Sequence, residues 1–340
     1  MDSITHIVLG ACIGDAVLSK KIGKKAMLVG AIAQSFPDFD FLGGLWLSLP
    51  ENLYFHRGIT HSFFFGFFMA FILAFVTQNI FRKQALPFKK LFIFFCLQMW
   101  LHDILDTCNS YGTGLLEPFS HHRFSFDLLF VADPFFTIPL IAAAIALLVL
   151  KTSSSFRKNW IVAGLFLPCM YLIYSVSNKD SVDEQVAKSL AKQEIQNTGF
   201  ITTPTPFNTW LWYIMVPTDS GVHIGYRSVY DTKNYVTPFT FYPKNEQLLS
   251  SRENSNDVIY LKKFADTIYT IEKYNDSLIF TVPRFGRIAG WDKKPSAFNF
   301  QYYLNDGFDN TLVIQRGRAK EVDRNIFARM YYRIKGVGKE

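Results

Sequence analysis

Hydrophobic and polar positions divide this chain into two regions. Long apolar runs lie almost entirely within residues 1–178, whereas charges of both signs are spread through residues 179–340. A helix that crosses a membrane needs about 20 mainly apolar residues. Six runs approach that length, and we expect each to be a span: residues 4–19, 26–47, 62–81, 90–107, 128–150 and 159–177. Residues 1–178 are therefore predicted to form an α-helical integral membrane domain with about six spans.

The second run differs from the others because PDFD, Pro37 to Asp40, interrupts it. We expect residues 26–36 to rise to the membrane surface as a helix. The apolar residues that follow, 41–49 (FLGGLWLSL), are predicted to form a short re-entrant or interfacial segment.

Lysine and arginine in short loops predict the orientation. Three loops, residues 20–25, 81–90 and 151–158, hold 11 of the 13 basic residues in residues 1–178. Such loops remain in the cytoplasm, and these three alternate regularly with the spans. The N-terminal sequence MDSITH has no basic segment and no cleavage site, so we do not expect a signal peptide. We predict an integral protein of the cytoplasmic (inner) membrane whose N-terminus and residues after 178 lie outside the cytoplasm.

Residues 179–340 carry the pattern of a small β domain. Val182, Val186 and Leu190 recur at helical spacing, which predicts an initial amphipathic helix over 181–196. Two prolines in TPTPFN then break the pattern. Short alternating runs separated by turn residues follow at 210–216, 222–230, 258–264, 277–282, 298–304 and 311–317. We therefore predict a mainly antiparallel β domain over 179–340, in the periplasm or outside the cell.

Composition narrows the classes of function. The net charge of +7 is shared by both regions and forms no basic stripe, so we expect no nucleic-acid partner. All four cysteines lie in the first region, which argues against a disulfide framework or a cysteine zinc site. The sequence does not indicate an oligomeric state.

Histidines and aspartates concentrate on the predicted outer face. Six of the seven histidines lie there, in segments such as HRGITH (56–61) and HDILD (102–106), and none lies on the inner face. His102 and Asp106 are four apart on a predicted helix, so they share one side of it. Histidine with carboxylate, without thiolate, favours a catalytic zinc or other divalent site, and such groups are costly near a membrane. The predicted ligands are His6, Asp38, Asp40, His56, His61, His102 and Asp106.

Simpler explanations compete with this one. A single histidine at the end of a span is usually only an interfacial residue, and Asp38 or Asp40 could cap a helix beside Pro37. Arg57 and Arg123, the two basic residues outside the cytoplasmic loops, could be lipid-headgroup anchors. The gathering of six histidines on one side favours the metal site over these explanations taken together.

Four ordered motifs carry a resemblance to a known family. DxxTH near the start, PDxD, HRGxTHS and HDxLDxxxxxG resemble the signature of the YdjM-type membrane-bound metal-dependent hydrolases, over residues 1 to about 180. That resemblance implies a divalent metal and a hydrolytic reaction whose substrate it does not define. The set of histidines and aspartates itself favours zinc, or else manganese, with about one or two ions per chain.

A more distant similarity is to zinc-dependent phospholipase C and the S1/P1 nucleases. Their order of ligands would correspond here to His6, Asp38 or Asp40, His56 or His61, then His102 and Asp106, with Asp106 as the bridge between two ions. Their later His and HxxxE/D pattern is not reproduced, and His121 or His122 with Asp127 is the candidate substitute. Those enzymes also use a processed N-terminal amino group, and no such processing is evident in this sequence.

The leading hypothesis is a phosphoesterase acting on a lipid or lipid-linked substrate at the outer leaflet. Arg57 and Arg123 would clamp the phosphate, because a planar guanidinium matches its oxygens. His122 is a candidate ligand or acid for the leaving group, and Asp103 a further candidate catalytic residue. Two alternatives stay open: a metal-dependent amidase or deacylase on a lipid or envelope substrate, and a non-enzymatic transporter or metal-binding scaffold.

Overall fold

The computed structural model describes residues 1–250, 252–274, 277–287, 289–292, 297–304 and 325–337. The chain divides into two compact units. Unit 1 comprises Met1–Gly43, Phe55–Ser175 and Pro206–Asn208, and unit 2 comprises Gly44–Tyr54, Val176–Thr205 and Thr209–Glu340.

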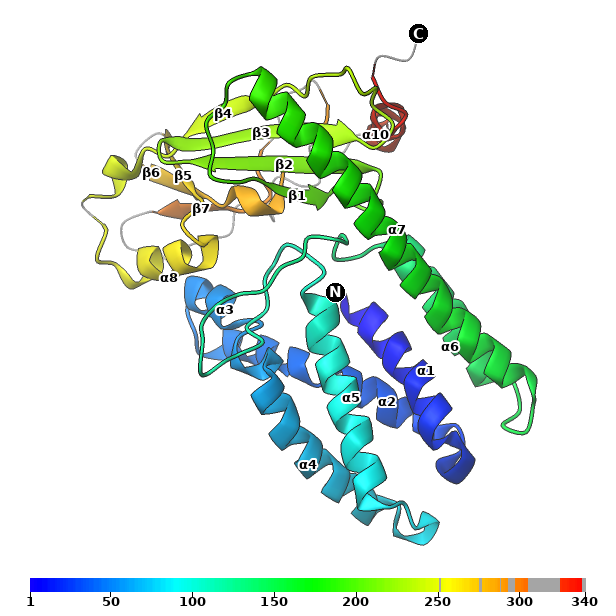
Figure 1. The fold of residues 1–340 in the computed structure, drawn as a ribbon. Coiled ribbons are helices and arrows are strands. Elements are labelled where there is room, and N and C mark those ends of the chain that lie inside the picture. Colours follow the sequence, from blue (N-terminus) through cyan, green and yellow to red (C-terminus); the bar gives the residue numbers. More distant parts are fainter. Residues whose placement is uncertain (251, 275–276, 288, 293–296, 305–324, 338–340) are drawn as a thin grey trace. The chain divides into compact units, whose positions relative to one another are not determined.

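Unit 1 is built from helices (Figure 1). In chain order they are α1 (Ser3–Ile22), α2 (Lys25–Ser35), the 3-10 helices η1 (Pro37–Leu45) and η2 (Ile59–His61), α4 (Phe63–Ile80), η3 (Arg82–Gln84), α5 (Phe88–Asp106), α6 (Pro134–Val149) and the first part of α7 (Phe156–Lys192). Helix α1 packs against α2, α5 and α6, and α4 packs against α5. Their shared core contains leucine and phenylalanine side chains such as Leu18, Leu91, Phe94 and Leu140.

Glycines let α1 and α2 approach each other closely. A Cβ atom at Gly10 would lie 2.3 Å from the carbonyl oxygen of Gly30, and one at Gly14 would lie 2.2 Å from that of Ala26. These contacts pair the two helices in antiparallel fashion. His6, near the start of α1, therefore lies at the end of the pair where α2 leads into η1.

Three helices among the described residues are long and apolar enough to cross a membrane: α1, α4 and α7. Helix α6 is apolar but has only 16 residues. It begins at Pro134 because Asp133 caps it, so the predicted span over 128–150 starts too early. The remaining spans and the orientation of the chain stay predictions.

A buried ion pair joins α1 to α7 at the end of α6. Arg157 contacts Asp15, and it donates hydrogen bonds to the carbonyl oxygens of Leu147 (2.6 Å) and Leu150 (2.8 Å). Both charged side chains are buried. The arginine thus satisfies backbone carbonyls that α6 leaves without helical partners at its C-terminus.

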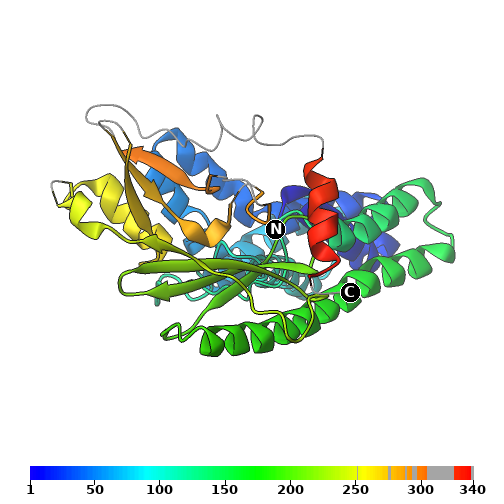
Figure 2. The ribbon, with the colours of Figure 1, turned by 90° about the horizontal axis from the view of Figure 1, so that it is seen from above.

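Unit 2 contains two antiparallel sheets (Figure 2). The first has the order β1 (Ile201–Pro204), β2 (Leu211–Thr218), β3 (Gly221–Ser228), β4 (Thr240–Pro243), and the second has the order β5 (Thr270–Tyr274), β6 (Ser277–Thr281), β7 (Gln301–Leu304). Its other elements are α3 (Leu49–Phe55), which ends at the boundary with unit 1, η4 (Glu246–Leu249), α8 (Asn256–Ala265), η5 (Pro283–Phe285) and α10 (Ile326–Ile334). The predicted antiparallel β region is confirmed.

The second half of α7 covers one face of the first sheet. Val182, Val186 and Leu190 pack against alternate residues of β2, namely Trp212, Ile214 and Val216. The intervening residues Tyr213 and Met215 face the opposite side of the sheet, where they pack with Val222, Ile224 and Phe298. The predicted amphipathic helix is therefore real, and α7 continues into it without a break.

One predicted strand is wrong. Residues 258–264 form most of α8, whose buried residues Val258, Leu261, Phe264 and Ala265 recur at helical spacing. Ser255 caps the helix by accepting a hydrogen bond from the backbone N–H of Val258, and Asp266 ends it in the left-handed conformation. The predicted strand over 311–317 lies outside the described residues.

Candidate metal centre

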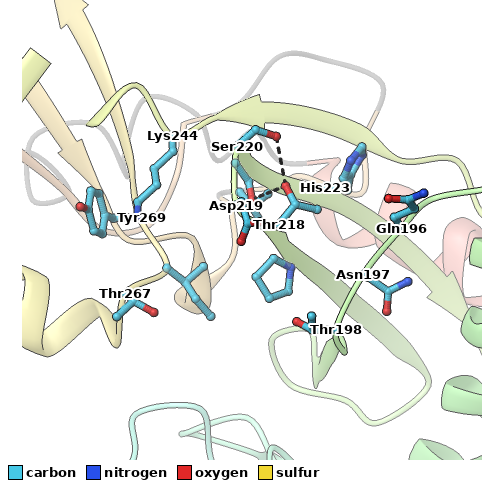
Figure 3. Close-up of a pocket in the computed structure, with 14 residues that line it drawn as sticks. Gln196, Asn197, Thr198, Thr218, Asp219, Ser220, His223, Lys244, Thr267 and Tyr269 are labelled. Carbon is cyan, nitrogen blue, oxygen red and sulfur yellow. Dashed lines mark hydrogen bonds between the residues drawn. The ribbon is translucent and has the colours of Figure 1, made fainter. Parts of the chain in front are cut away.

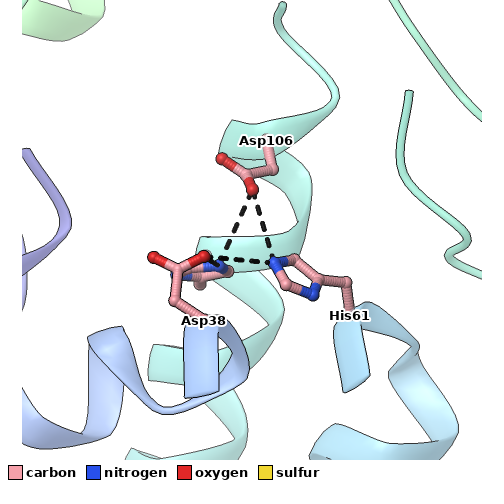
Figure 4. A group of neighbouring side chains, drawn as sticks. Asp38, His61 and Asp106 are labelled. Carbon is pink, nitrogen blue, oxygen red and sulfur yellow. Dashed lines mark ion pairs between the residues drawn. The ribbon is translucent and has the colours of Figure 1, made fainter. Parts of the chain in front are cut away.

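Four side chains from three separate segments of unit 1 converge (Figure 4). Asp38 comes from η1, His61 from the end of η2, and His102 and Asp106 from α5. One ligand atom from each lies within 4.8 Å of all the others. The side chains of the two histidines and Asp106 are fully buried, and that of Asp38 is 21% exposed. We call these four residues the metal group.

The local sequence explains how each segment presents its ligand. His102 and Asp106 lie one helical turn apart on α5. His61 ends η2 immediately before Ser62, whose hydroxyl caps α4 by accepting from the backbone N–H of Phe65 at 3.1 Å. Asp38 follows Pro37 at the start of η1, where the antiparallel pair of α1 and α2 ends.

The spacing of the donor atoms fits a small divalent ion. His61 Nε2 lies 3.4 Å from Asp38 Oδ1 and 3.5 Å from Asp106 Oδ2. His102 Nε2 lies 3.6 Å and 3.7 Å from the same two oxygens. Ligands about 2.0–2.1 Å from a tetrahedral zinc ion are separated by roughly 3.4 Å. Four of the six separations are therefore near the value that such an ion requires, and the other two are at most 4.8 Å.

Hydrogen bonding supports the same interpretation. His61 Nε2 and His102 Nε2 are buried and make no hydrogen bond to a described residue. Asp106 Oδ2 is also buried, and it pairs with Arg57 Nε at 3.0 Å. A buried polar atom without a partner costs about 1–3 kcal/mol. The other nitrogen of each histidine is occupied, because His102 Nδ1 donates to the carbonyl oxygen of Gln34 (2.6 Å) and His61 Nδ1 faces Thr60 Oγ1 (3.1 Å). Both rings are thus oriented with Nε2 toward the metal group.

Electrostatics shift two members of the group that lie outside the long helices. Burial opposes ionisation of Asp38, but the facing His61 and the neighbouring His102 outweigh it and hold the pKa of Asp38 well below its usual range. Burial likewise opposes protonation of His61, but the facing carboxylates of Asp106 and Asp38 outweigh it and raise the pKa of His61 to about 9.

Asp40 and His56, two predicted ligands, lie behind His61 and outside the four-residue group. Asp40 Oδ1 is 2.9 Å from His56 Nδ1. Asp40 Oδ2 accepts from the backbone N–H of Arg57 (2.9 Å) and from Thr60 Oγ1 (3.1 Å), and it lies 3.4 Å from His61 Nδ1. In this arrangement Asp40 orients His61. The His56 side chain is 29% exposed.

Asp106 presents its two oxygens to different sets of nitrogen atoms. Oδ2 faces His61, His102 and Arg57, whose Nε is 3.0 Å away. Oδ1 faces His6 Nε2 at 3.1 Å and also contacts the α-amino group of Met1. The His6 ring stacks on the His102 ring with centroids 3.8 Å apart. A carboxylate placed in this way can serve one ion through each oxygen.

The arginine of HRGITH is buried beside Asp106. Its Nη1 donates to Asn109 Oδ1 (2.8 Å) and to the backbone carbonyl of Asp106 (3.4 Å), and its guanidinium lies 4.9 Å from the centre of the Tyr111 ring. Arg57 has a φ of 60°, a left-handed conformation that is uncommon for a residue with a side chain. Its backbone and side chain thereby reach Asp40 and Asp106 at the same time.

Comparison with known proteins places these ligands in a family. Residues 1–182, more than half of the chain, match the family described as YdjM inner membrane protein. The chain belongs to the YdjM inner membrane protein family. All four residues of the metal group, and His6, Asp40, His56 and Arg57 around them, lie within the matched segment.

Two curated proteins resemble parts of this YdjM family member. Inner membrane protein YbcI of Escherichia coli (strain K12) is 32% identical over 123 residues, covering 36% of this chain and 69% of that protein. YfhP of Bacillus subtilis (strain 168), an uncharacterized protein, is 32% identical over 153 residues, covering 42% of this chain and 45% of that protein. No solved structure matches the chain. The distant similarity to phospholipase C and the nucleases is not shown and stays a prediction.

The other predicted catalytic residues of this YdjM protein lie outside the four-residue group. Arg123, half-buried, donates from Nη1 to the backbone carbonyl of His56 at 2.9 Å. Asp103 is fully buried beside His102, and its carboxyl oxygens make no hydrogen bond to a described residue. His122 lies on the exposed loop after α5, edge-on to the Phe124 ring. His121 is 74% exposed and pairs with Glu117 at 2.9 Å.

Sequence reasoning missed several residues that hold the site. The Gln34 carbonyl leaves no signal in the sequence, because any residue supplies one. Thr60 and Asn109 could have been noticed, since polar side chains beside HRGITH and HDILD are natural partners for His61 and Arg57. Asp133, the cap of α6, accepts from the backbone N–H of Phe135 and from the Tyr171 hydroxyl.

Unit 2 of this YdjM protein contains a separate polar cavity of about 880 Å³ (Figure 3). It lies beside the turn between β2 and β3, and its lining includes Thr218, Asp219, Ser220, His223, Lys244 and Tyr269. Lys244 pairs at 2.9 Å with Glu246, which also pairs with Lys262 at 3.0 Å. None of the predicted ligands or catalytic residues lines this cavity.

Proposed function

We propose that this chain is a membrane-bound metal-dependent hydrolase that cleaves a phosphoester of a lipid or lipid-linked substrate at the outer face of the cytoplasmic membrane. The observation that carries the proposal is the metal group: four His and Asp side chains with converging ligand atoms, three of them fully buried. Membership of an inner membrane protein family and three apolar helices support the location in a membrane.

The proposed ligands of a first ion are Asp38, His61, His102 and Asp106. His6 Nε2 and Asp106 Oδ1, which face each other at 3.1 Å, would help to hold a second ion. Two imidazoles with two carboxylates suit zinc best and manganese next. A divalent ion bound there supplies Lewis acidity toward a phosphoryl oxygen.

The chain's own residues have distinct roles in this proposal. Asp40 fixes the tautomer and orientation of His61, as a carboxylate behind a ligating histidine does. Arg57 holds the Asp106 carboxylate through Nε. Arg123 is less buried than Arg57 and donates to the backbone of His56, so it is the better placed of the two arginines to bind a phosphate oxygen. Its positive charge favours a phosphoester substrate over an uncharged amide.

Metal analysis combined with a lipid assay tests the proposal. Purified wild-type protein should carry about one or two zinc or manganese ions per chain, and it should release phosphate or a phosphorylated headgroup from an extract of membrane lipids. His102→Ala and Asp106→Ala should each lose most of the metal and the activity. His121→Ala is the matched control, because this exposed histidine lies outside the metal group.

Two outcomes would contradict the proposal in different ways. Unchanged metal content in both ligand variants would show that the metal group does not bind the ion. Full metal content in the wild type without any lipid hydrolysis would favour a metal-binding scaffold, and release of fatty acid in place of phosphate would favour a deacylase.

A further inference from the structure

Exposure of the four side chains in the metal group indicates that the group is accessible from one side, the side of Asp38. His61, His102 and Asp106 are completely buried, and Asp38 is the one member with an exposed fraction, 21%. A substrate must therefore reach the group beside Asp38. The surroundings of Asp38 within η1 then determine what kind of molecule can approach.

Helix η1 turns its acids inward and its apolar residues outward. Asp40 is buried, whereas Phe39, Phe41 and Leu42 are 48%, 63% and 42% exposed. We call these three side chains the apolar lip. Large exposed apolar side chains that lie together in this way mark a surface that contacts another apolar phase or a partner.

The apolar lip continues an exposed apolar stripe on α2. Leu28 and Ile32, one turn apart, are 63% and 49% exposed, and the Phe36 ring, one turn further on, lies 5.2 Å from the Phe39 ring. Helix α2 packs along α1, which is long and apolar enough to cross a membrane. The outward stripe of α2 is thus part of the surface that such a bundle presents to lipid.

The distribution of charged residues also favours contact with lipid. Between residues 26 and 50 the only charged side chains are Asp38 and Asp40, and both are engaged with histidines of the site. A surface that docks a soluble protein normally carries a polar rim, whereas a segment in contact with acyl chains avoids charge.

We propose that Phe39, Phe41 and Leu42 lie among the acyl chains of the membrane, and that a membrane lipid reaches Asp38 along this apolar lip. The approach of a lipid to Asp38 rests on the proposed function, whereas the location of the apolar lip among the acyl chains does not. The partner is a lipid with long acyl chains, whose polar group would stop where the apolar lip meets Asp38.

Accessibility of a spin label tests the location of the apolar lip. Phe41→Cys is labelled in a Cys169→Ser background, because Cys169 is exposed and the other three cysteines are buried. The protein is placed in vesicles of phosphatidylcholine and phosphatidylglycerol, and relaxation by oxygen is compared with relaxation by a water-soluble nickel complex. Phe71→Cys, 56% exposed on the candidate span α4, is the lipid control, and Glu184→Cys, 65% exposed on the polar part of α7, is the water control.

The label at residue 41 should behave like the one at 71, with an oxygen-to-nickel ratio several-fold above that at 184. A ratio like that at 184 would overturn the proposal, and so would protection from both reagents, which would indicate a protein partner or a second copy of this chain. Leu42→Cys provides the same measurement if the Phe41 variant does not fold. The measurement needs neither metal nor activity, so failure of the apolar lip and failure of the proposed hydrolase are distinguishable.

Discussion

The two buried imidazoles of the metal group are held from behind by different acceptors. His102 donates to a backbone carbonyl, that of Gln34, whereas His61 faces the Asp40 carboxylate. A carboxylate makes an imidazole a stronger ligand than a carbonyl does, and such supporting groups typically contribute 10–100-fold to metal affinity. Single residues outside the ligand set should therefore control how tightly an ion is bound.

Asp40→Asn tests this at the residue scale. The amide keeps the shape of the side chain but loses the charge behind His61, so we expect zinc affinity to fall by about 10–100-fold. Competition with a chromogenic chelator measures the change. Asp127→Asn is a suitable control, because Asp127 bonds Ser125 and contacts no member of the metal group in the described contacts. Equal affinity in Asp40→Asn and wild type would show that Asp40 does not support the ligand.

The raised pKa of His61 makes a second residue-scale prediction. A pKa of about 9 means that His61 carries a proton at pH 7.5 in the metal-free protein, and a metal requires the neutral imidazole. Zinc binding at pH 7.5 should therefore release about one proton, and apparent affinity should rise from pH 6 toward pH 9 and then level off. Calorimetry in buffers of different ionisation enthalpy measures the proton count. No release at pH 7.5 would contradict the assignment of His61.

The sequence predicted the members of the metal group, but not which of the predicted residues are ligands and which support a ligand. Asp38, His61, His102 and Asp106 were all among seven predicted ligands, because residue type and the four-residue spacing in α5 identify such groups. Asp38 and Asp40 stand two residues apart in PDFD, and nothing in that pattern distinguishes a ligand from the group behind a ligand. That distinction depends on how η1 turns relative to η2 and α5.

At the scale of elements, apolar runs predicted helices more reliably than short alternating runs predicted strands. The long runs became α1, α4, α5 and α7, because a long apolar segment satisfies its own backbone hydrogen bonds as a helix. VIYLKKF is short enough to fit both a period of 2 and a period of 3.6. The cap from Ser255 and the burial of Leu261 and Phe264 decided in favour of helix α8.

The ion pair between α1 and α7 carries a prediction at the same scale. Removing one partner leaves a buried charge without compensation, which costs about 3–5 kcal/mol in soluble proteins. Asp15→Ala should therefore lower the free energy of unfolding measurably in a titration with sodium dodecyl sulfate, by about 3 kcal/mol. Glu184→Ala breaks an exposed pair with Lys188 and should change stability by no more than about 1 kcal/mol. Similar stability in both variants would contradict a structural role for the buried pair.

At the scale of the whole molecule, the distribution of basic loops predicts which side of the membrane each part occupies. Arg157, counted among the cytoplasmic basic residues, is buried in an ion pair, yet ten lysines and arginines remain in the three loops. The orientation therefore does not depend on that residue.

A fusion after Glu340 tests the orientation. Alkaline phosphatase, which is active outside the cytoplasm, should be active there, and a fluorescent reporter that matures only in the cytoplasm should stay dark. Fusions within residues 81–90 should give the opposite pair of signals. A fluorescent C-terminal fusion would place residues after 178 in the cytoplasm and would move the proposed site to the other face.

The order of the metal group along the chain has a consequence for biosynthesis. Every member, together with His6, Asp40, His56 and Arg57, lies within the first 106 of 340 residues. A ribosome therefore completes the set of ligands before it makes α6, α7 or any strand of unit 2. If the group binds an ion, its proposed ligands are all translated before α6, α7 and the strands of unit 2, so uptake of the ion need not wait for these later elements.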